Sequence, residues 1–260
     1  QSGRYDAGSI IDTSPGMVRV GSKVIEDEHP QGAISLGQVL ARSSNVGMTK
    51  IALSLQPQES WSTMSKLGFG QVTSSGFPGE SAGVFTNYAN WRPPGIASLS
   101  YGYGIAVTPL QLVHAYATIG AGGIARPVSM LRVDGVVPGE RVLDERAART
   151  LVGLLEAVVA AGGTGTRAGI PGYRVSGKTG TAWKAGVGGY SADPRYVAVF
   201  GGLAPASRPR LAAVVVIDDP SAGKYYAGDV AAPVFSSVVG GALRLMGVEP
   251  DAVRPDNDRM

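Results

Sequence analysis

Three segments in the last third of the chain constrain the fold most. Residues 196–203 and 211–217 are rich in apolar side chains, residues 175–182 combine Val with Thr and small residues, and segments rich in Gly, Pro and polar residues separate the three. This pattern predicts three strands, and the short connections favour antiparallel pairing in sequence order. Residues 214–217 contain no polar side chain, so we expect both faces of that strand to be covered.

Helical patterns come before these strands. Ser35 followed by Gln38 is a capping-box pattern, which predicts a helix that runs to about residue 42. Further helices are predicted at about 46–55, which Pro57 would end, and at 58–66.

The next segment is expected to be mostly loop until a strong helix signal appears. Residues 67–106 are interrupted by prolines, whereas Thr108-Pro109 combines a good N-cap with a residue suited to the first helical position. In that helix a stripe predicted to be buried repeats at four- and three-residue spacing, namely Leu112, Tyr116 and Ile119.

Two more helices complete the α+β pattern. One begins at Asp144 and carries Leu and Val side chains along one side over 151–159. The other begins at Pro233, is expected to cover the sheet, and has on one side Val234, Val238, Ala242 and Leu245. Helices, then an antiparallel sheet, then a covering helix predict an α+β layered domain.

A single domain with a polar tail is the expected organisation. The helical region covers about 33–162, the sheet and covering helix about 174–247, and the tail, expected to fray, 248–260. The first residues include no Met and no signal-peptide pattern, and they are typical of the middle of a domain. We therefore expect the chain to be the C-terminal part of a longer polypeptide.

Composition excludes several kinds of site. There is no Cys, and the two histidines, His29 and His114, are too few for a His-rich metal site. Basic residues are scattered and the net charge is only +3, so we expect no nucleic-acid partner. No apolar run reaches the ~18 residues that a membrane span needs.

The stretch VSGKTGTAWKAG, which begins at Val175, has three possible interpretations. Residues 172–179 formally match a phosphate-binding loop, but the spacer Tyr-Arg-Val-Ser is bulky and a poor helix start follows. The second interpretation is an edge strand on which Lys178 attracts a carboxylate, Thr179 and Thr181 bind the ligand, and Gly180 leaves room for it. The third is a Gly-rich strand with a surface lysine.

A second element, Ser43-Ser44-Asn45, favours the ligand-binding strand. Ser-x-Asn followed by Lys-Thr-Gly is typical of penicillin-interacting serine enzymes. The chain resembles the transpeptidase domain of class B penicillin-binding proteins, especially the division-specific, FtsI-like ones. The resemblance rests on SSNVGMTKIAL, LGFGQVTSSGFPGESAG, YGYGIAVTPLQLVHAYATIGAGG, GGTGTRAGIPGYRVSGKTGTAWK and YYAGDVAAPVF.

The resemblance implies the penicillin-binding-protein/serine β-lactamase-like fold and acyl transfer through a serine, without cofactor or metal. Peptidoglycan stem peptides would be cross-linked, and β-lactams would acylate the same serine. Expected partners are a membrane-anchored glycosyltransferase and division proteins, at the periplasmic face of the cytoplasmic membrane.

Roles carried over from the family fall on the two motifs. Ser43 would relay protons to the leaving amine, and Asn45 would bind an amide of the acyl group. Lys178 would set the electrostatics of the carboxylate site. Thr179 and Thr181, with Gly180 between them, would bind the substrate, and the Thr181 N–H would serve the oxyanion hole.

Other side chains are weaker candidates. Tyr196, Tyr225 and Tyr226 would wall the pocket and Tyr103 its rim, although ordinary core packing explains them equally well. Trp183 could lie over the cleft or outside it. For His114 we expect a packing role, and for Glu80 a loop anchor.

Three functions remain open on the sequence alone. A D,D-transpeptidase is favoured, and the alternatives are a D,D-carboxypeptidase or serine β-lactamase relative, or a non-catalytic sensor or scaffold. No segment resembles the deacylating Glu loop of class A β-lactamases.

The family's nucleophilic Ser-x-x-Lys is not found in residues 1–42, so we expect it upstream of residue 1. Ser221 is followed by Lys224 at the right spacing, but Pro220 and Gly223 predict a turn there. Replacing Ser221 by Ala in the full-length protein should therefore leave β-lactam acylation intact. Complete loss of acylation in a folded S221A protein would identify Ser221 as the nucleophile instead.

Overall fold

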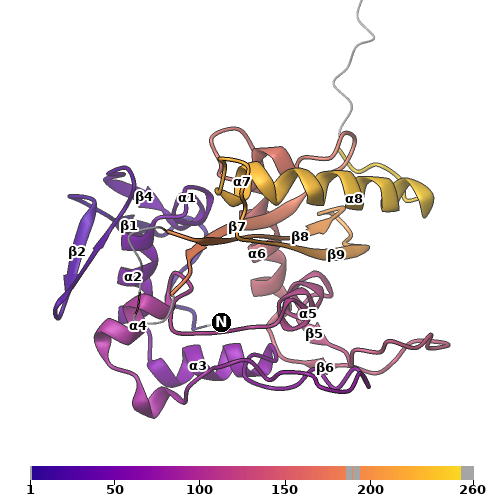
Figure 1. The fold of residues 1–260 in the computed structure, drawn as a ribbon, viewed down its shortest axis with the longest axis horizontal. Coiled ribbons are helices and arrows are strands. Elements are labelled where there is room, and N and C mark those ends of the chain that lie inside the picture. Colours follow the sequence, from indigo (N-terminus) through magenta and orange to yellow (C-terminus); the bar gives the residue numbers. More distant parts are fainter. Residues whose placement is uncertain (1, 186–188, 190–193, 253–260) are drawn as a thin grey trace, which may run out of the picture. The chain divides into compact units, whose positions relative to one another are not determined.

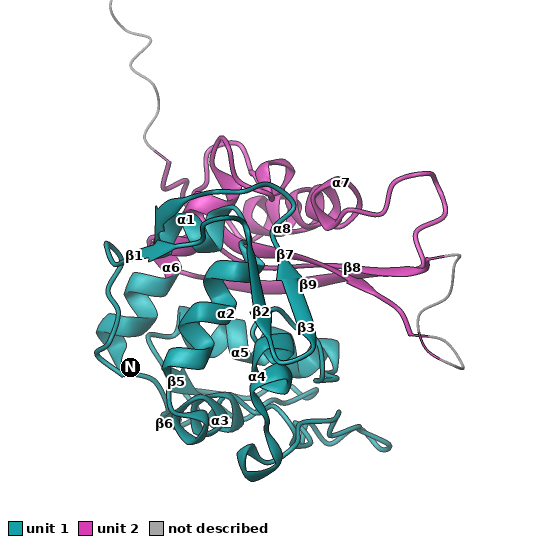
Figure 2. Ribbon diagram, turned by 90° about the vertical axis from the view of Figure 1, so that its left-hand side faces the viewer, with its two compact units in different colours: residues 1–151 teal, residues 152–260 magenta. Residues whose placement is uncertain are grey.

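The computed structural model describes residues 2–185, 189 and 194–252. The chain forms two compact units, unit 1 (Gln1–Leu151) and unit 2 (Val152–Met260), which Figure 2 distinguishes by colour.

Unit 1 begins with two small antiparallel sheets. Strand β1 (Ile10–Asp12) pairs with β4 (Ala33–Ser35), and β2 (Met17–Val20) pairs with β3 (Lys23–Glu26). Gly21 has a φ of +61° in the tight turn between β2 and β3, a conformation that glycine adopts without steric cost.

The predicted helices of unit 1 are confirmed, with prolines at several starts. They are α1 (Leu36–Ala41), α2 (Asn45–Ser54), α3 (Pro57–Lys66) and α5 (Pro109–Gly120), and the capping boxes of Ser35 with Gln38 and Thr108 with Gln111 are both formed.

The segment 67–106, expected to be mostly loop, also contains two short helical elements that were not predicted. Residues Pro93–Leu99 form helix α4, and a short 3₁₀ turn, η1, covers Tyr88–Asn90. Pro57 and Pro93 each begin a helix rather than end one. The reason is that the first helical N–H needs no partner within the helix, so proline fits there.

The buried face of α5 differs from the predicted apolar stripe. Gln111, Ala115 and Thr118 are buried, whereas the predicted Leu112, Tyr116 and Ile119 are only half-buried. Gln111 can be buried because its amide is fully hydrogen-bonded. Its Oε1 accepts from the Thr108 N–H at 2.8 Å, and its Nε2 donates to the carbonyls of Gln71 and Ala82 at 2.7 and 2.9 Å.

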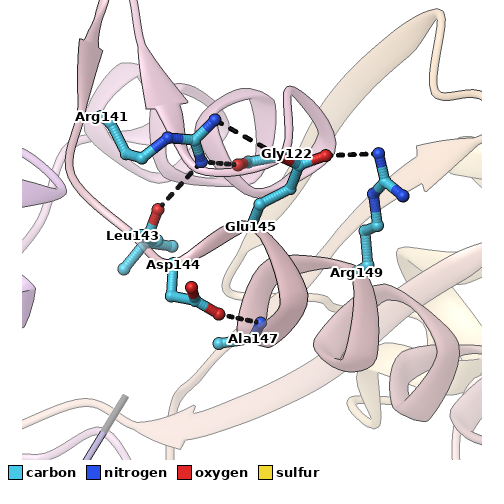
Figure 3. Close-up of polar contacts among 7 residues, drawn as sticks. All are labelled: Gly122, Arg141, Leu143, Asp144, Glu145, Ala147 and Arg149. Atoms are coloured by element: carbon cyan, nitrogen blue, oxygen red, sulfur yellow. Dashed lines mark hydrogen bonds and ion pairs between the residues drawn. The ribbon is translucent and has the colours of Figure 1, made fainter.

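Helix α6 (Glu145–Val159) begins in a cluster of polar contacts (Figure 3). The Asp144 carboxylate accepts from the Ala147 N–H at 2.8 Å, which caps the helix as predicted. Arg141 donates to the Gly122 carbonyl at 2.8 Å, and Glu145 pairs with both Arg141 and Arg149. Arg141 belongs to β6 (Glu140–Arg141), which pairs with β5 (Ile124–Ala125).

Unit 2 contains the predicted three-stranded sheet. Strands β7 (Ser176–Trp183), β8 (Tyr196–Ala204) and β9 (Leu211–Asp218) are antiparallel in the order β7-β8-β9, so β7 is an edge strand (Figure 1). The remaining elements are η2 (Thr166–Ala168), α7 (Ala227–Val230) and α8 (Ala232–Leu245).

Helix α8 covers one face of this sheet, but with the side opposite to the one singled out in the sequence. Phe235, Val239 and Leu243 are buried in the core with Phe200 of β8, whereas Val238 is 61% exposed and Val234 and Leu245 are also exposed. The sequence pattern failed here because α8 is apolar on both sides.

The expectation that residues 214–217 are covered on both faces is also wrong at one position. Alternate side chains of β9, including Val215 and Ile217, pack against the core with α8, whereas Val216 points the other way and is 38% exposed.

The first part of the predicted tail is held in place rather than frayed. Tyr173 donates its hydroxyl to the Val248 carbonyl at 2.6 Å, and the Asp251 carboxylate accepts from the N–H groups of Arg174 and Ser207 at 2.7 and 3.0 Å. The rest of the predicted tail, 253–260, lies outside the described residues. Within the part of the chain that the structure describes, every helix is too short or too polar to cross a bilayer.

Gln111 gives a test of this packing. Replacing it by Leu would leave the Gln71 and Ala82 carbonyls and the Thr108 N–H without their partner, so we expect the free energy of unfolding to fall by about 2–4 kcal/mol. The matched control is Q38L, which breaks the corresponding capping box of α1 at an exposed glutamine and should cost about 1 kcal/mol or less. Urea unfolding of both variants measures the difference, and equal losses would contradict the role of the buried amide.

Candidate functional site

The Ser43-Ser44-Asn45 motif forms the turn between α1 and α2 in unit 1. Ser43 is exposed and has a φ of +57°, an uncommon conformation for a residue other than glycine. Ser44 is the buried N-cap of α2, and its hydroxyl accepts from the Gly47 N–H at 2.9 Å. The strained backbone at Ser43 therefore depends on a well-fixed helix start one residue later.

Asp27, which the sequence analysis did not single out, fixes this turn. Its carboxylate accepts from the Ser44 hydroxyl at 2.6 Å and from the Val46 N–H at 3.0 Å. The residue stands in the acidic run Glu26-Asp27-Glu28, and nothing in the sequence distinguishes it from its neighbours. An anion at the first turn of a helix is also favoured by the helix dipole.

The other two candidates of unit 1 lie on separate segments. Asn45, in the first turn of α2, donates from Nδ2 to the Glu26 carbonyl at 3.3 Å. Tyr103 follows α4 and packs edge-on against Tyr101, with ring centroids 5.8 Å apart. The structure thus places Ser43 and Asn45 together at one turn and Tyr103 in a loop.

Lys178 lies in β7 of unit 2, on the edge strand that the ligand-binding interpretation requires. Burial lowers the pKa of its ammonium group from the ordinary 10.5 to about 8, and Nζ donates to the Thr179 carbonyl at 3.0 Å. The phosphate-loop interpretation is wrong, because the strand continues through Trp183 and no helix N-terminus follows the lysine.

Gly177 and Gly180 flank Lys178 and Thr179, and they differ in how much space a side chain would have there. A Cβ at Gly177 would lie 2.4 Å from the Phe200 ring, so packing alone requires glycine there. A Cβ at Gly180 would meet only the Val199 carbonyl oxygen, at 4.0 Å. Core packing therefore does not explain Gly180, which leaves the exposed middle of the edge strand open to a ligand backbone.

The hydroxyl groups of Thr179 and Thr181 are both hydrogen-bonded to neighbouring segments. The Thr179 hydroxyl lies 2.6 Å from the Thr164 hydroxyl, and the Thr181 hydroxyl accepts from the Ala227 N–H at 3.0 Å. Because the two threonines are two residues apart on a strand, their side chains share a face.

Three predicted tyrosines form one stack in unit 2. The rings of Tyr196 and Tyr225 are parallel with centroids 4.2 Å apart, and Tyr226 follows at 4.5 Å from Tyr225. Tyr226 is 47% exposed, so the stack is not part of the buried core. Trp183, at the end of β7, is 39% exposed.

Ser221 and Lys224 lie in the loop between β9 and α7 rather than on a helix. Gly223 has a φ of +75°, as a turn requires, and Lys224 Nζ is 3.9 Å from the Asp229 carboxylate. The turn predicted at this position is confirmed.

His114 and Glu80 make structural contacts in unit 1. His114 Nε2 is hydrogen-bonded to the Arg126 carbonyl at 2.8 Å. Glu80 accepts from the hydroxyls of Ser75 and Thr73 and from the Ser75 N–H, and these hydrogen bonds lower the pKa of its carboxyl to about 2. Glu80 therefore anchors the loop over 73–80, as predicted.

Comparison with known proteins gives consistent matches along the chain. The peptidoglycan D,D-transpeptidase FtsI of Escherichia coli K12 is 46% identical over 253 residues, which is 97% of this chain and 42% of FtsI. The probable peptidoglycan D,D-transpeptidase PenA of Neisseria meningitidis is 37% identical over 96% of this chain and 42% of PenA. The chain thus spans less than half the length of these curated relatives.

A solved structure agrees with the sequence comparison. The transpeptidase domain of penicillin-binding protein 3 from Burkholderia pseudomallei superposes with a TM-score of 0.91 at 38% identity, covering 96% of this chain and 76% of that one. The sequence model of the penicillin-binding protein transpeptidase domain matches residues 1–240. The chain therefore belongs to the penicillin-binding protein transpeptidase family, with the α+β fold expected of it.

Proposed function

We propose that this chain forms most of the catalytic domain of a serine-type peptidoglycan D,D-transpeptidase that acts in cell division. The observation that carries the proposal is the open edge strand β7, which presents Lys178, Thr179, Gly180 and Thr181 within a match to the family that runs over residues 1–240. The identity of 46% to the Escherichia coli FtsI transpeptidase supports the division role.

The reaction is acyl transfer in two steps. A serine hydroxyl attacks the carbonyl carbon between the two terminal D-alanines of a stem peptide, the peptide C–N bond breaks, and free D-alanine leaves with the serine proton on its amine. The amine of a second stem peptide then attacks the ester, which frees the serine and forms the cross-linking amide. The nucleophilic serine is proposed to precede residue 1.

The residues of this chain bind the substrate and move protons. Ser43 is proposed to relay the proton to the leaving amine, and Asn45 to bind the amide of the acyl group. Lys178 supplies positive charge toward the terminal carboxylate while Thr179 and Thr181 donate hydrogen bonds to it, and the Thr181 N–H stabilises the tetrahedral oxyanion. The fixed turn at Ser43 suits proton relay because catalysis needs a preorganised donor.

The same proposal includes roles for the aromatic side chains, the domain organisation and the partners. Tyr103 and the stack of Tyr196, Tyr225 and Tyr226 would contact substrate or a β-lactam. Both units would belong to one domain, which is supported by the family match across residues 1–240. A membrane-anchored glycosyltransferase and division proteins are the proposed partners, at the periplasmic face of the cytoplasmic membrane.

Labelling of the full-length protein with a fluorescent penicillin tests the function. We expect one covalent adduct on wild type, and an acylation rate about 10²–10⁴ times lower for S43A, because general acid–base groups contribute that much. The control S207A changes an exposed loop serine and should react like wild type. Absence of labelling of the folded wild type would overturn the proposal, whereas rapid release of the adduct would favour a β-lactamase.

The pKa of Lys178 gives a second test. The lysine is charged below its pKa, and burial lowers that pKa to about 8, so the attraction for a carboxylate should be lost as the pH rises through about 8. The second-order acylation rate, which reports the free enzyme, should therefore fall with an apparent pKa near 8 rather than near 10.5.

Two variants test whether this pH dependence comes from Lys178. K178R keeps its charge, so its rate should stay flat through pH 9, although it starts lower because the guanidinium is larger. K224R alters a lysine on the exposed loop after β9 and should retain the wild-type profile. A wild-type rate that is constant up to pH 10 would contradict the assignment.

A further inference from the structure

Both threonines of the edge strand have a hydrogen-bond partner behind them. The Ala227 N–H donates to the Thr181 hydroxyl oxygen at 3.0 Å, and the Thr164 hydroxyl lies 2.6 Å from the Thr179 hydroxyl. Thr164 is in the segment before η2, and Ala227 is the first residue of α7, so two separate segments of unit 2 reach the same face of β7.

The segment that carries Thr164 is firmly placed. A Cβ at Gly228 would lie 2.4 Å from the Thr164 carbonyl oxygen, so the two backbones are in close contact. Arg167, in η2, donates to the Asp229 carboxylate at 3.1 Å and to the Asp229 carbonyl at 3.3 Å. These contacts tie Thr164 to the start of α7, which also holds Thr181.

The direction of each hydrogen bond decides what the threonines can offer a ligand. An amide N–H can only donate, so the Thr181 hydroxyl accepts from Ala227 and its own proton remains available for another acceptor. Between Thr164 and Thr179 either hydroxyl can donate. When Thr164 donates, the Thr179 proton is likewise available, and the chain of two hydroxyls strengthens the outer hydrogen bond.

We propose that Thr164 is a positioning residue that directs the Thr179 hydroxyl proton toward the carboxylate of the substrate. The inference rests on the proposed function, in which Thr179 and Thr181 bind that carboxylate. The Thr164 hydroxyl and the Ala227 N–H then act alike, each satisfying a threonine oxygen from behind so that both threonine protons face the anion. The proposed effect is specific to ligands that carry a carboxylate.

The experiment compares an acid with its ester. The full-length enzyme and its T164V variant are reacted with benzylpenicillin and with the methyl ester of benzylpenicillin, in which the carboxylate is masked. Valine has nearly the shape of threonine but cannot donate, so T164V should lower the second-order acylation rate for the acid about three- to tenfold. The rate for the ester should change by less than about twofold, since a neutral ester accepts a weaker hydrogen bond.

Two further variants separate the hydroxyl from its surroundings. T164S restores the donor and should return the ratio of the acid rate to the ester rate to the wild-type value. T166V makes the same change at an exposed threonine two residues away and should leave that ratio unchanged. Because both substrates are measured on one preparation, the ratio does not depend on the fraction of folded enzyme, and T164A serves if T164V does not fold.

The outcomes are distinct. An equal loss of rate on acid and ester would show that Thr164 acts only in packing, and an unchanged acid rate would show that Thr179 needs no donor behind it; either result overturns the inference. If folded wild type does not react with either compound, the proposed function itself fails, and the inference fails with it.

Discussion

The packing of one phenylalanine ring holds the candidate site of unit 2 in place. Phe200 is fully buried, with its ring 4.8 Å from that of Phe235 on α8, and a Cβ at Gly165, Gly177 or Gly202 would lie within 3.1 Å of it. Gly165 follows Thr164 and Gly177 precedes Lys178. The ring in the core thereby fixes the backbone beside both residues, because interiors packed at this density transmit small shifts.

In unit 1, buried or half-buried polar side chains fix the backbone of loops and turns. Gln111 binds the carbonyls of a segment that has little regular structure, Glu80 anchors its neighbouring loop, and Asp27 fixes the turn at Ser43. Loops cannot satisfy their own backbone groups as helices and strands do, so side chains supply the missing partners. The strained residue Ser43 is stable only in such a setting.

Local signals in the sequence predict local structure well. The three strands, the capping box of Ser35 with Gln38 and the N-cap at Thr108 are confirmed, because each depends mainly on neighbours in sequence. The helix at 93–99 was missed because its prolines begin the helix rather than break it. The buried face of α5 and the exposed Val216 depend on which surfaces meet in space, and there the predictions are wrong. Asp27 lies in no motif, and Thr164 lies in a family-like stretch that gives it no role of its own, so only their distances to Ser44 and Thr179 reveal them.

The contacts of Arg174 join the two ends of unit 2. Its guanidinium binds the Glu156 carboxylate at 2.8 and 2.9 Å, near the start of the unit, and its N–H donates to Asp251, near the last described residue. The early and late segments of unit 2 therefore lie close together in space, as the ends of many domains do. The segments around Glu156 and Asp251 lie close enough for a short linker to join them, which is the condition that a circular permutation with new termini in an exposed loop requires.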